Sequence, residues 1–157
     1  MNKILEIILE SKYSIHDLSR NKSKKAKETF RMNMPFELGL DYGVFQFHDD
    51  VKYRNKTMLI LEDEAYSLKS AISDISFADC KPHKNDAEQL VEEVRNWFVE
   101  NGFTDIQGPS MIWDEFNEFN AELYNRKTKE GFKSNQVDRL SIPEYLEAIN
   151  DWLINPL

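Results

Sequence analysis

The sequence predicts an α/β fold, a parallel sheet with covering helices, followed by a helical C-terminal part. Up to residue 101, apolar stretches typical of strands alternate with amphipathic stretches of helical period, the pattern of βα units. Beyond that point only helical periodicity remains. The chain has 157 residues, which suits a single domain able to bury about two-thirds of its unfolded surface.

The N-terminal region predicts a helix, a strand and a second helix. Residues 2–11 carry isoleucine and leucine at helical spacing. Residues 13–19 alternate like a short strand with a polar end, as at the carboxyl edge of a parallel sheet. Residues 20–31 form a basic stretch that we expect to be a mobile connection. Asn33 is then expected to cap a helix that has Pro35 in its first turn.

The middle of the chain contains the clearest strand. Residues 57–62 are a continuous apolar run typical of a buried parallel strand. A short helix is expected over residues 66–75, and a longer one from Asn85 to Gly102. Two parallel strands alone make too small a sheet. We therefore expect further strands, which residues 44–53, a partner, or elements missing in front of Met1 could supply.

The last third of the chain predicts two helices. Pro109 is expected to open the first, and Ser141 with Glu144 forms a capping box before the second. Their aromatic residues recur at the spacing of a helix face that packs into a core. These aromatic positions are Trp113, Phe116, Phe119, Tyr145 and Trp152.

Composition narrows the classes of function. The net charge of −8 disfavours non-specific binding to nucleic acid, which relies on neutralising phosphates. Residues 1–60 have a balance of +3 and residues 61–157 one of −11, so a small anionic ligand fits the first part better. No apolar run approaches the roughly 20 residues of a membrane span, and the first residues do not resemble a signal peptide. Cys80 is the single cysteine. We expect a soluble cytoplasmic protein without cofactor, metal or membrane partner.

Two carboxylates are the candidates for chemistry. Asp17 lies where the first strand ends, and Glu37 lies in the first turn of the following helix. Ligands of open α/β sheets bind beyond the carboxyl ends of the strands. A carboxylate there can attack an anomeric carbon or stabilise an oxocarbenium ion. The structural alternative is that Glu37 complements the helix dipole and Asp17 caps a loop. Gly39 and Gly43 are expected to let the helix approach a strand or ligand closely.

A family resemblance favours the chemical interpretation. Residues 11–20 (SKYSIHDLSR) and 31–39 (RMNMPFELG) resemble a group of bacterial proteins of largely unassigned function. That group is similar to the nucleoside 2-deoxyribosyltransferase and TIR-like superfamily, whose members bind nucleosides or nucleotides and often cleave N-glycosidic bonds. Glu37-Leu38-Gly39-Leu40 matches the E-L-G-Y-A-like helix start that carries the transferase nucleophile. Asp17 matches the aspartate that contacts substrate.

The helical pattern of the last third predicts that residues 105–157 form a helical extension packed on the core. The resemblance implies a flavodoxin-like α/β core over residues 1–104. It also implies that Glu37 attacks or stabilises the sugar C1′ and that Asp17 orients the ribose or base. Two departures stand out. The superfamily's opening strand, helix and second strand have no counterpart before Met1, and Arg31 stands where some transferases have an acid.

The remaining candidates are expected to bind the substrate. His16 can act as a general acid near neutral pH, although a strand histidine can also simply pack. The basic stretch 20–31 can hold a phosphate, or it can be a solvated loop. The full set of candidate binding residues is Ser14, His16, Arg20, Arg31 and Asn33.

Two function classes therefore remain open. The first is an enzyme that acts on a nucleoside or nucleotide through Glu37, either an N-glycosidase (a hydrolase) or a deoxyribosyltransferase-like enzyme. For it we expect the carboxylates of Asp17 and Glu37 to share one pocket within roughly 10 Å. The second is a non-catalytic nucleotide-sensing or protein-interaction module of the same fold. Either class is compatible with a homo-oligomer.

Overall fold

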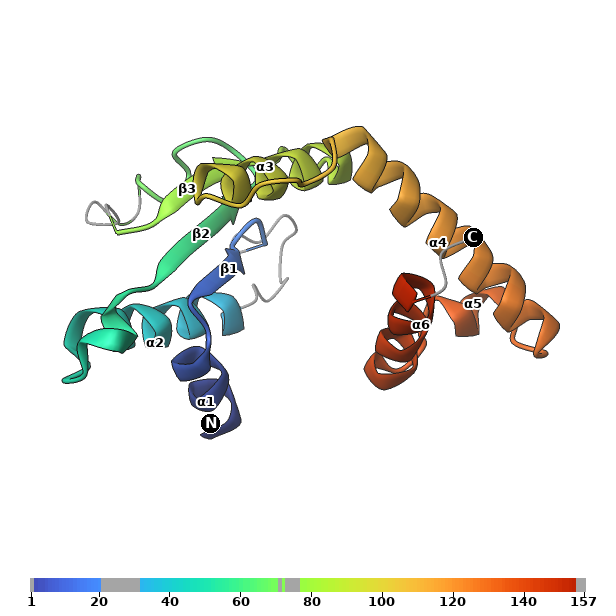
Figure 1. Cartoon of the computed structure of the whole chain (residues 1–157), viewed down its shortest axis with the longest axis horizontal. Coiled ribbons are helices and arrows are strands. Elements are labelled where there is room, and N and C mark those ends of the chain that lie inside the picture. Colours follow the sequence, from blue (N-terminus) through green and yellow to red (C-terminus); the bar gives the residue numbers. More distant parts are fainter. Residues whose placement is uncertain (1, 21–31, 71, 73–76, 155–157) are drawn as a thin grey trace, which may run out of the picture. The chain divides into compact units, whose positions relative to one another are not determined.

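The computed structural model describes residues 2–20, 32–70, 72 and 77–154. They divide into two compact units, Met1–Thr104 and Asp105–Leu157, and each unit is described by itself. The first unit contains α1 (Asn2–Glu10), β1 (Tyr13–Asp17), α2 (Asn33–Phe47), η1 (Val51–Arg54), β2 (Thr57–Glu62), β3 (Asp79–Pro82) and α3 (Ala87–Glu100) (Figure 1). The second contains α4 (Pro109–Lys129), α5 (Ser134–Val137) and α6 (Ile142–Ile154).

The described strands form one parallel sheet in the order β1-β2-β3. β1 and β2 pair from Tyr13 opposite Thr57 to Asp17 opposite Leu61, and β2 pairs in parallel with β3. The predicted α/β class with a parallel sheet is confirmed, and the arrangement is consistent with a flavodoxin-like core. The third strand, however, is residues 79–82. Residues 44–53 instead carry the end of α2 and most of η1.

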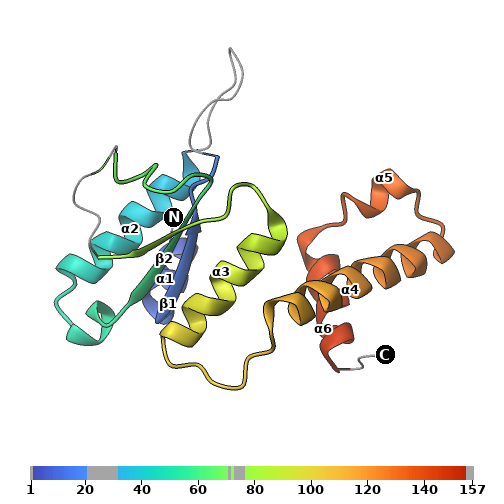
Figure 2. The same ribbon diagram turned by 90° about the horizontal axis from the view of Figure 1, so that it is seen from above.

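Helices cover both faces of the sheet, as Figure 2 shows with α2 and α3 on opposite sides. Side chains alternate between the two faces along β2. Met58 and Ile60 belong to a core cluster with Leu38 of α2, whereas Leu59 and Leu61 pack with Trp97 of α3. These four apolar side chains of β2 are buried, in agreement with the continuous apolar run from which the strand was predicted.

Three local expectations are corrected. Asn33 is the first residue of α2 and Met32 occupies the N-cap without a side-chain hydrogen bond, so Asn33 is not the cap. A Cβ at Gly39 or Gly43 would meet nothing within 4 Å, so neither glycine serves a close approach to a strand. Residues 65–70 form turns rather than a helix, with Tyr66 at a φ of 64°. The rest of that expected helix falls mainly on residues outside those described.

The second unit is a small helical assembly. Phe119 and Leu123 of α4 pack with Ala148 of α6 in its core. Pro109 opens α4 as predicted. The capping box is also confirmed, because the Ser141 N–H donates to Glu144 Oε2 (3.1 Å) and the Glu144 N–H donates to Ser141 Oγ (3.4 Å). None of the helices within the described residues is long and apolar enough to cross a membrane.

Candidate functional site

A cavity of about 280 Å³ lies beside β1 and is lined from α1, β1 and α2. β1 is an edge strand of the described sheet, which leaves its outer side open to the two helices. The lining combines apolar side chains with a few polar ones, the usual composition of a small-molecule site. The lining residues are Ile4, Ile7, Ile8, Ser11, Tyr13, Ser14, Ile15, His16, Met34, Glu37 and Asp41.

The polar groups meet there because of the periods of the elements that carry them. Glu37 and Asp41 are four residues apart on α2 and therefore share one face of the helix. Ser14 and His16 are two residues apart on β1 and therefore share one face of the strand. That face is the one covered by α2, since His16 Nε2 lies 3.1 Å from Asp41 Oδ2.

Asp41, which lines this cavity, is the centre of a buried charge cluster. Its side chain is fully buried and lies between His16 and the Lys56 ammonium, whose Nζ is 3.2 Å from Asp41 Oδ1. Lys56 Nζ also donates to the backbone carbonyls of Ile8 and Ser11. The Asp41 charge is thus offset within the protein, and the cluster ties α2 to β1 and to the residue before β2.

These contacts determine whether Asp41 is ionised and which nitrogen of His16 carries a hydrogen. Burial alone would raise the pKa of Asp41, but the hydrogen bond from His16 and the charge of Lys56 lower it below its usual value. An ionised carboxylate only accepts hydrogen bonds, so His16 Nε2 carries the hydrogen. His16 Nδ1 is buried and has no hydrogen-bond partner among the described residues. His16 also lines the cavity, so this nitrogen is a candidate for contact with a ligand.

Asp17 belongs to a different environment. It follows His16 in β1 and so faces the opposite side of the strand. Its carboxylate accepts a hydrogen bond from the Ser19 N–H (2.9 Å) and lies 3.6 Å from His83 Nε2. Asp17 is not among the residues that line the cavity. The structure therefore brings Glu37 together with Ser14 and His16, and not with Asp17.

The other candidates are not part of this lining. Arg20 is exposed, and Asn33 is exposed at the start of α2. Neither is among the lining residues. Arg31 and the lysines of the basic stretch lie outside the described residues. Across the residues that the structure describes, no group of three or more His, Cys, Asp or Glu side chains is arranged to hold a metal ion.

Sequence reasoning missed three residues of these clusters. Asp41 lies one helical turn after Glu37, a spacing that could have indicated a shared face. Lys56 directly precedes the strongest strand, but nothing local indicates its buried partner. His83 directly follows β3, a strand that the sequence pattern does not reveal.

Comparisons with protein-family models, with curated proteins and with solved structures gave no match to this chain. The resemblance to the nucleoside transferase and TIR-like superfamily therefore stays a prediction from the sequence.

Proposed function

We propose that the first unit binds a nucleoside or nucleotide in the cavity beside β1 and cleaves its N-glycosidic bond with Glu37. The observation that carries this proposal is that Glu37 and His16 line one cavity, with His16 held through Nε2 by the buried Asp41. The match of Glu37-Leu38-Gly39-Leu40 to the transferase helix start gives independent support from the sequence.

In the proposed reaction, a carboxylate oxygen of Glu37 forms a bond to C1′ while the bond from C1′ to the base nitrogen breaks. The electron pair of that bond leaves with the base, which takes a proton from Nδ1 of the protonated His16. Water then attacks C1′ and gives a proton back to Nδ1 of His16, while the bond from C1′ to the Glu37 carboxylate breaks. In a transferase, a nitrogen of a second base attacks C1′ and gives up its proton in place of water. Asp41 and Lys56 act as positioning residues, since Asp41 holds His16 through Nε2 and Lys56 offsets the charge of Asp41.

One observation favours the alternative, a nucleotide-sensing module without chemistry. The resemblance assigns substrate contact to Asp17, yet Asp17 is engaged with Ser19 and His83 and does not line the cavity. A chain that retains the cavity without that contact could bind a nucleoside and leave its glycosidic bond intact.

Base release distinguishes the two functions. Deoxynucleosides, nucleotides and NAD are incubated with the wild type, with Glu37→Gln and with the control Glu64→Gln, and free base is quantified by chromatography. Glu64 is an exposed acid in the turn after β2 and does not line the cavity. We expect release by wild type and control, and a loss of about a hundredfold or more in Glu37→Gln, as for groups that act in a transition state.

The other outcomes are equally informative. If no compound is cleaved while one of them raises the melting temperature of the wild type, the binding module is the correct assignment. If Glu37→Gln, still folded, releases base as fast as the control, Glu37 is not the catalytic residue.

A further inference from the structure

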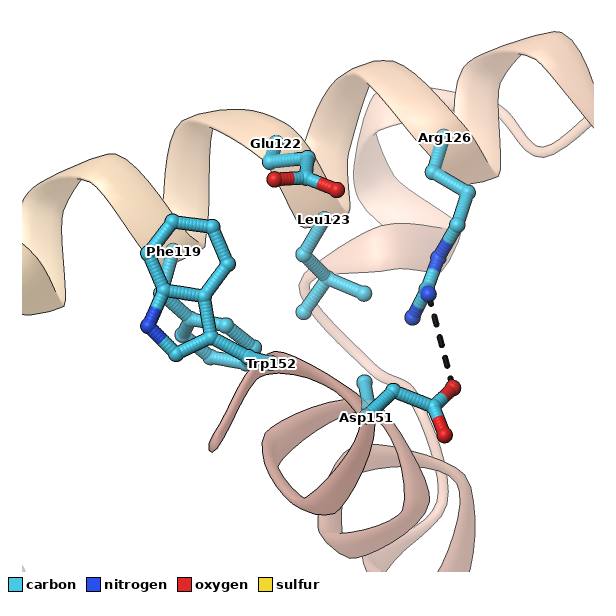
Figure 3. Close-up of a pocket in the computed structure, with 7 residues that line it drawn as sticks. Phe119, Glu122, Leu123, Arg126, Asp151 and Trp152 are labelled. Carbon is cyan, nitrogen blue, oxygen red and sulfur yellow. Dashed lines mark ion pairs between the residues drawn. The ribbon is translucent and has the colours of Figure 1, made fainter. Parts of the chain in front are cut away.

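A second cavity, of about 250 Å³, lies in the C-terminal unit between α4 and α6 (Figure 3). The side chains of its apolar part belong to the core of that unit, and charged side chains complete the lining. It is separate from the site that contains Glu37. Its lining residues are Phe119, Glu122, Leu123, Arg126, Ala148, Asp151 and Trp152.

Glu122 is the unusual member of this lining. Its Oε2 atom is buried and has no hydrogen-bond partner among the described residues. A carboxylate oxygen can only accept hydrogen bonds, and a buried oxygen without a donor destabilises the fold. A donor supplied by a ligand would remove this penalty.

Arg126, the nearby arginine in the lining, forms an ion pair with another carboxylate. Arg126 Nη1 lies 3.6 Å from Asp151 Oδ2, the ion pair drawn as a dashed line in Figure 3. These two opposite charges offset each other. The cavity therefore keeps one uncompensated negative charge, that of Glu122, and a cation is the ligand whose charge complements it.

Aromatic side chains in the lining favour an organic cation over a metal ion. The rings of Trp152 and Phe119 pack edge to face with centroids 6.0 Å apart. Figure 3 shows the Glu122 carboxylate between the Trp152 indole and Arg126, above Leu123. An aromatic face attracts an ammonium or guanidinium group, and the apolar wall accommodates its carbon chain. A bare metal ion would instead require several oxygen, nitrogen or sulfur ligands.

We propose that this cavity binds an organic cation through an ammonium or guanidinium group, with Glu122 as its charge partner and Trp152 as its aromatic wall. The group belongs either to a free amine or to a lysine or arginine side chain of another protein. Both sources present the same chemistry to Glu122.

Isothermal titration calorimetry on the full chain tests the proposal with two probes. Agmatine represents a free amine, and N-acetyl-arginine N-methylamide represents an arginine within a polypeptide. We expect saturable binding of at least one probe, about tenfold or more weaker in Glu122→Gln, because a charge-assisted hydrogen bond is lost. Glu118→Gln, the matched control at an exposed acid of α4 that does not line the cavity, should bind like the wild type.

A second variant distinguishes a loss of binding at Glu122 from a loss of folding. Asp151→Asn frees Arg126, which can then pair with Glu122 one turn away on the same helix and compete with the probe. Weaker binding in both Glu122→Gln and Asp151→Asn, with unchanged helical circular dichroism, supports the proposal. Stronger binding of agmatine indicates a free amine, and stronger binding of the blocked arginine a protein side chain. Absence of saturable binding of either probe, or equal affinity in Glu122→Gln and Glu118→Gln, overturns it.

Discussion

Each unit of the molecule contains a carboxylate next to a cavity, and the two carboxylates differ in their partners within the protein. In the first unit, Asp41 is completely buried and is matched by His16 and Lys56. In the second, the buried oxygen of Glu122 has no partner among the described residues. The difference indicates two roles. A buried carboxylate that has partners within the protein supports the structure of a site. A buried carboxylate oxygen without a partner marks a position where a ligand can supply the missing hydrogen-bond donor.

Removing the Asp41 charge should produce the largest change in stability. Asp41→Asn leaves the ammonium of Lys56 buried without its counter-charge, and breaking a buried ion pair in this way costs about 3–5 kcal/mol. We expect urea denaturation to show a loss of this order in the free energy of unfolding. Asp49→Asn, at an exposed acid just after α2, should stay within about 0.5 kcal/mol of the wild type. A cost below about 1 kcal/mol for Asp41→Asn would mean that the cluster is not matched as described.

The same cluster predicts a pH dependence. The pKa of Asp41 is lower in the folded protein than in the unfolded chain, where it is about 3.9. The unfolded chain therefore takes up the proton first on acidification. The stability that Asp41 contributes is complete above its unfolded pKa and is lost as pH falls through the lowered folded pKa. Unfolding followed at decreasing pH should show the wild type losing its advantage over Asp41→Asn, and a constant difference would contradict this interpretation.

The smallest change is expected at Glu122. Because Oε2 has no partner to lose, Glu122→Gln should alter the free energy of unfolding by no more than about 1 kcal/mol, with stabilisation as the expected sign. Thermal unfolding without added ligand measures this directly. A large destabilisation would show that Glu122 already has a partner within the protein, and the contrast with Asp41 would disappear.

The sequence was most informative where structure depends on neighbours along the chain. The alternation over residues 13–19, the apolar run at 57–62 and the capping box at Ser141 each led to an element that the structure contains. β3 was not recognised because it has only four residues, two of them charged, and takes its pairing from β2. A strand this short has too little pattern of its own to be identified.

The candidate site could also be predicted only where it depends on residues that are neighbours along the chain. Glu37 could be selected from its local motif, and it does line a cavity. The pairing of Asp41 with Lys56 depends on how α2 lies over the sheet, which no local pattern specifies. The separation of Asp17 from this cavity does not follow from strand alternation alone, because Tyr13 and Ile15 lie on the same side of β1 as Asp17 and still line the cavity.

The most direct test of the proposed function compares Glu37→Gln with Asp17→Asn in the base-release assay, on the compound that the wild type cleaves best. Glu37 lines the cavity and Asp17 does not. We predict that Glu37→Gln loses activity by about a hundredfold or more while Asp17→Asn stays within about threefold of the wild type. Activity that depends on Asp17 and survives the loss of Glu37 would move the site to the side of the sheet where Asp17 meets His83, and would contradict the catalytic role proposed for Glu37.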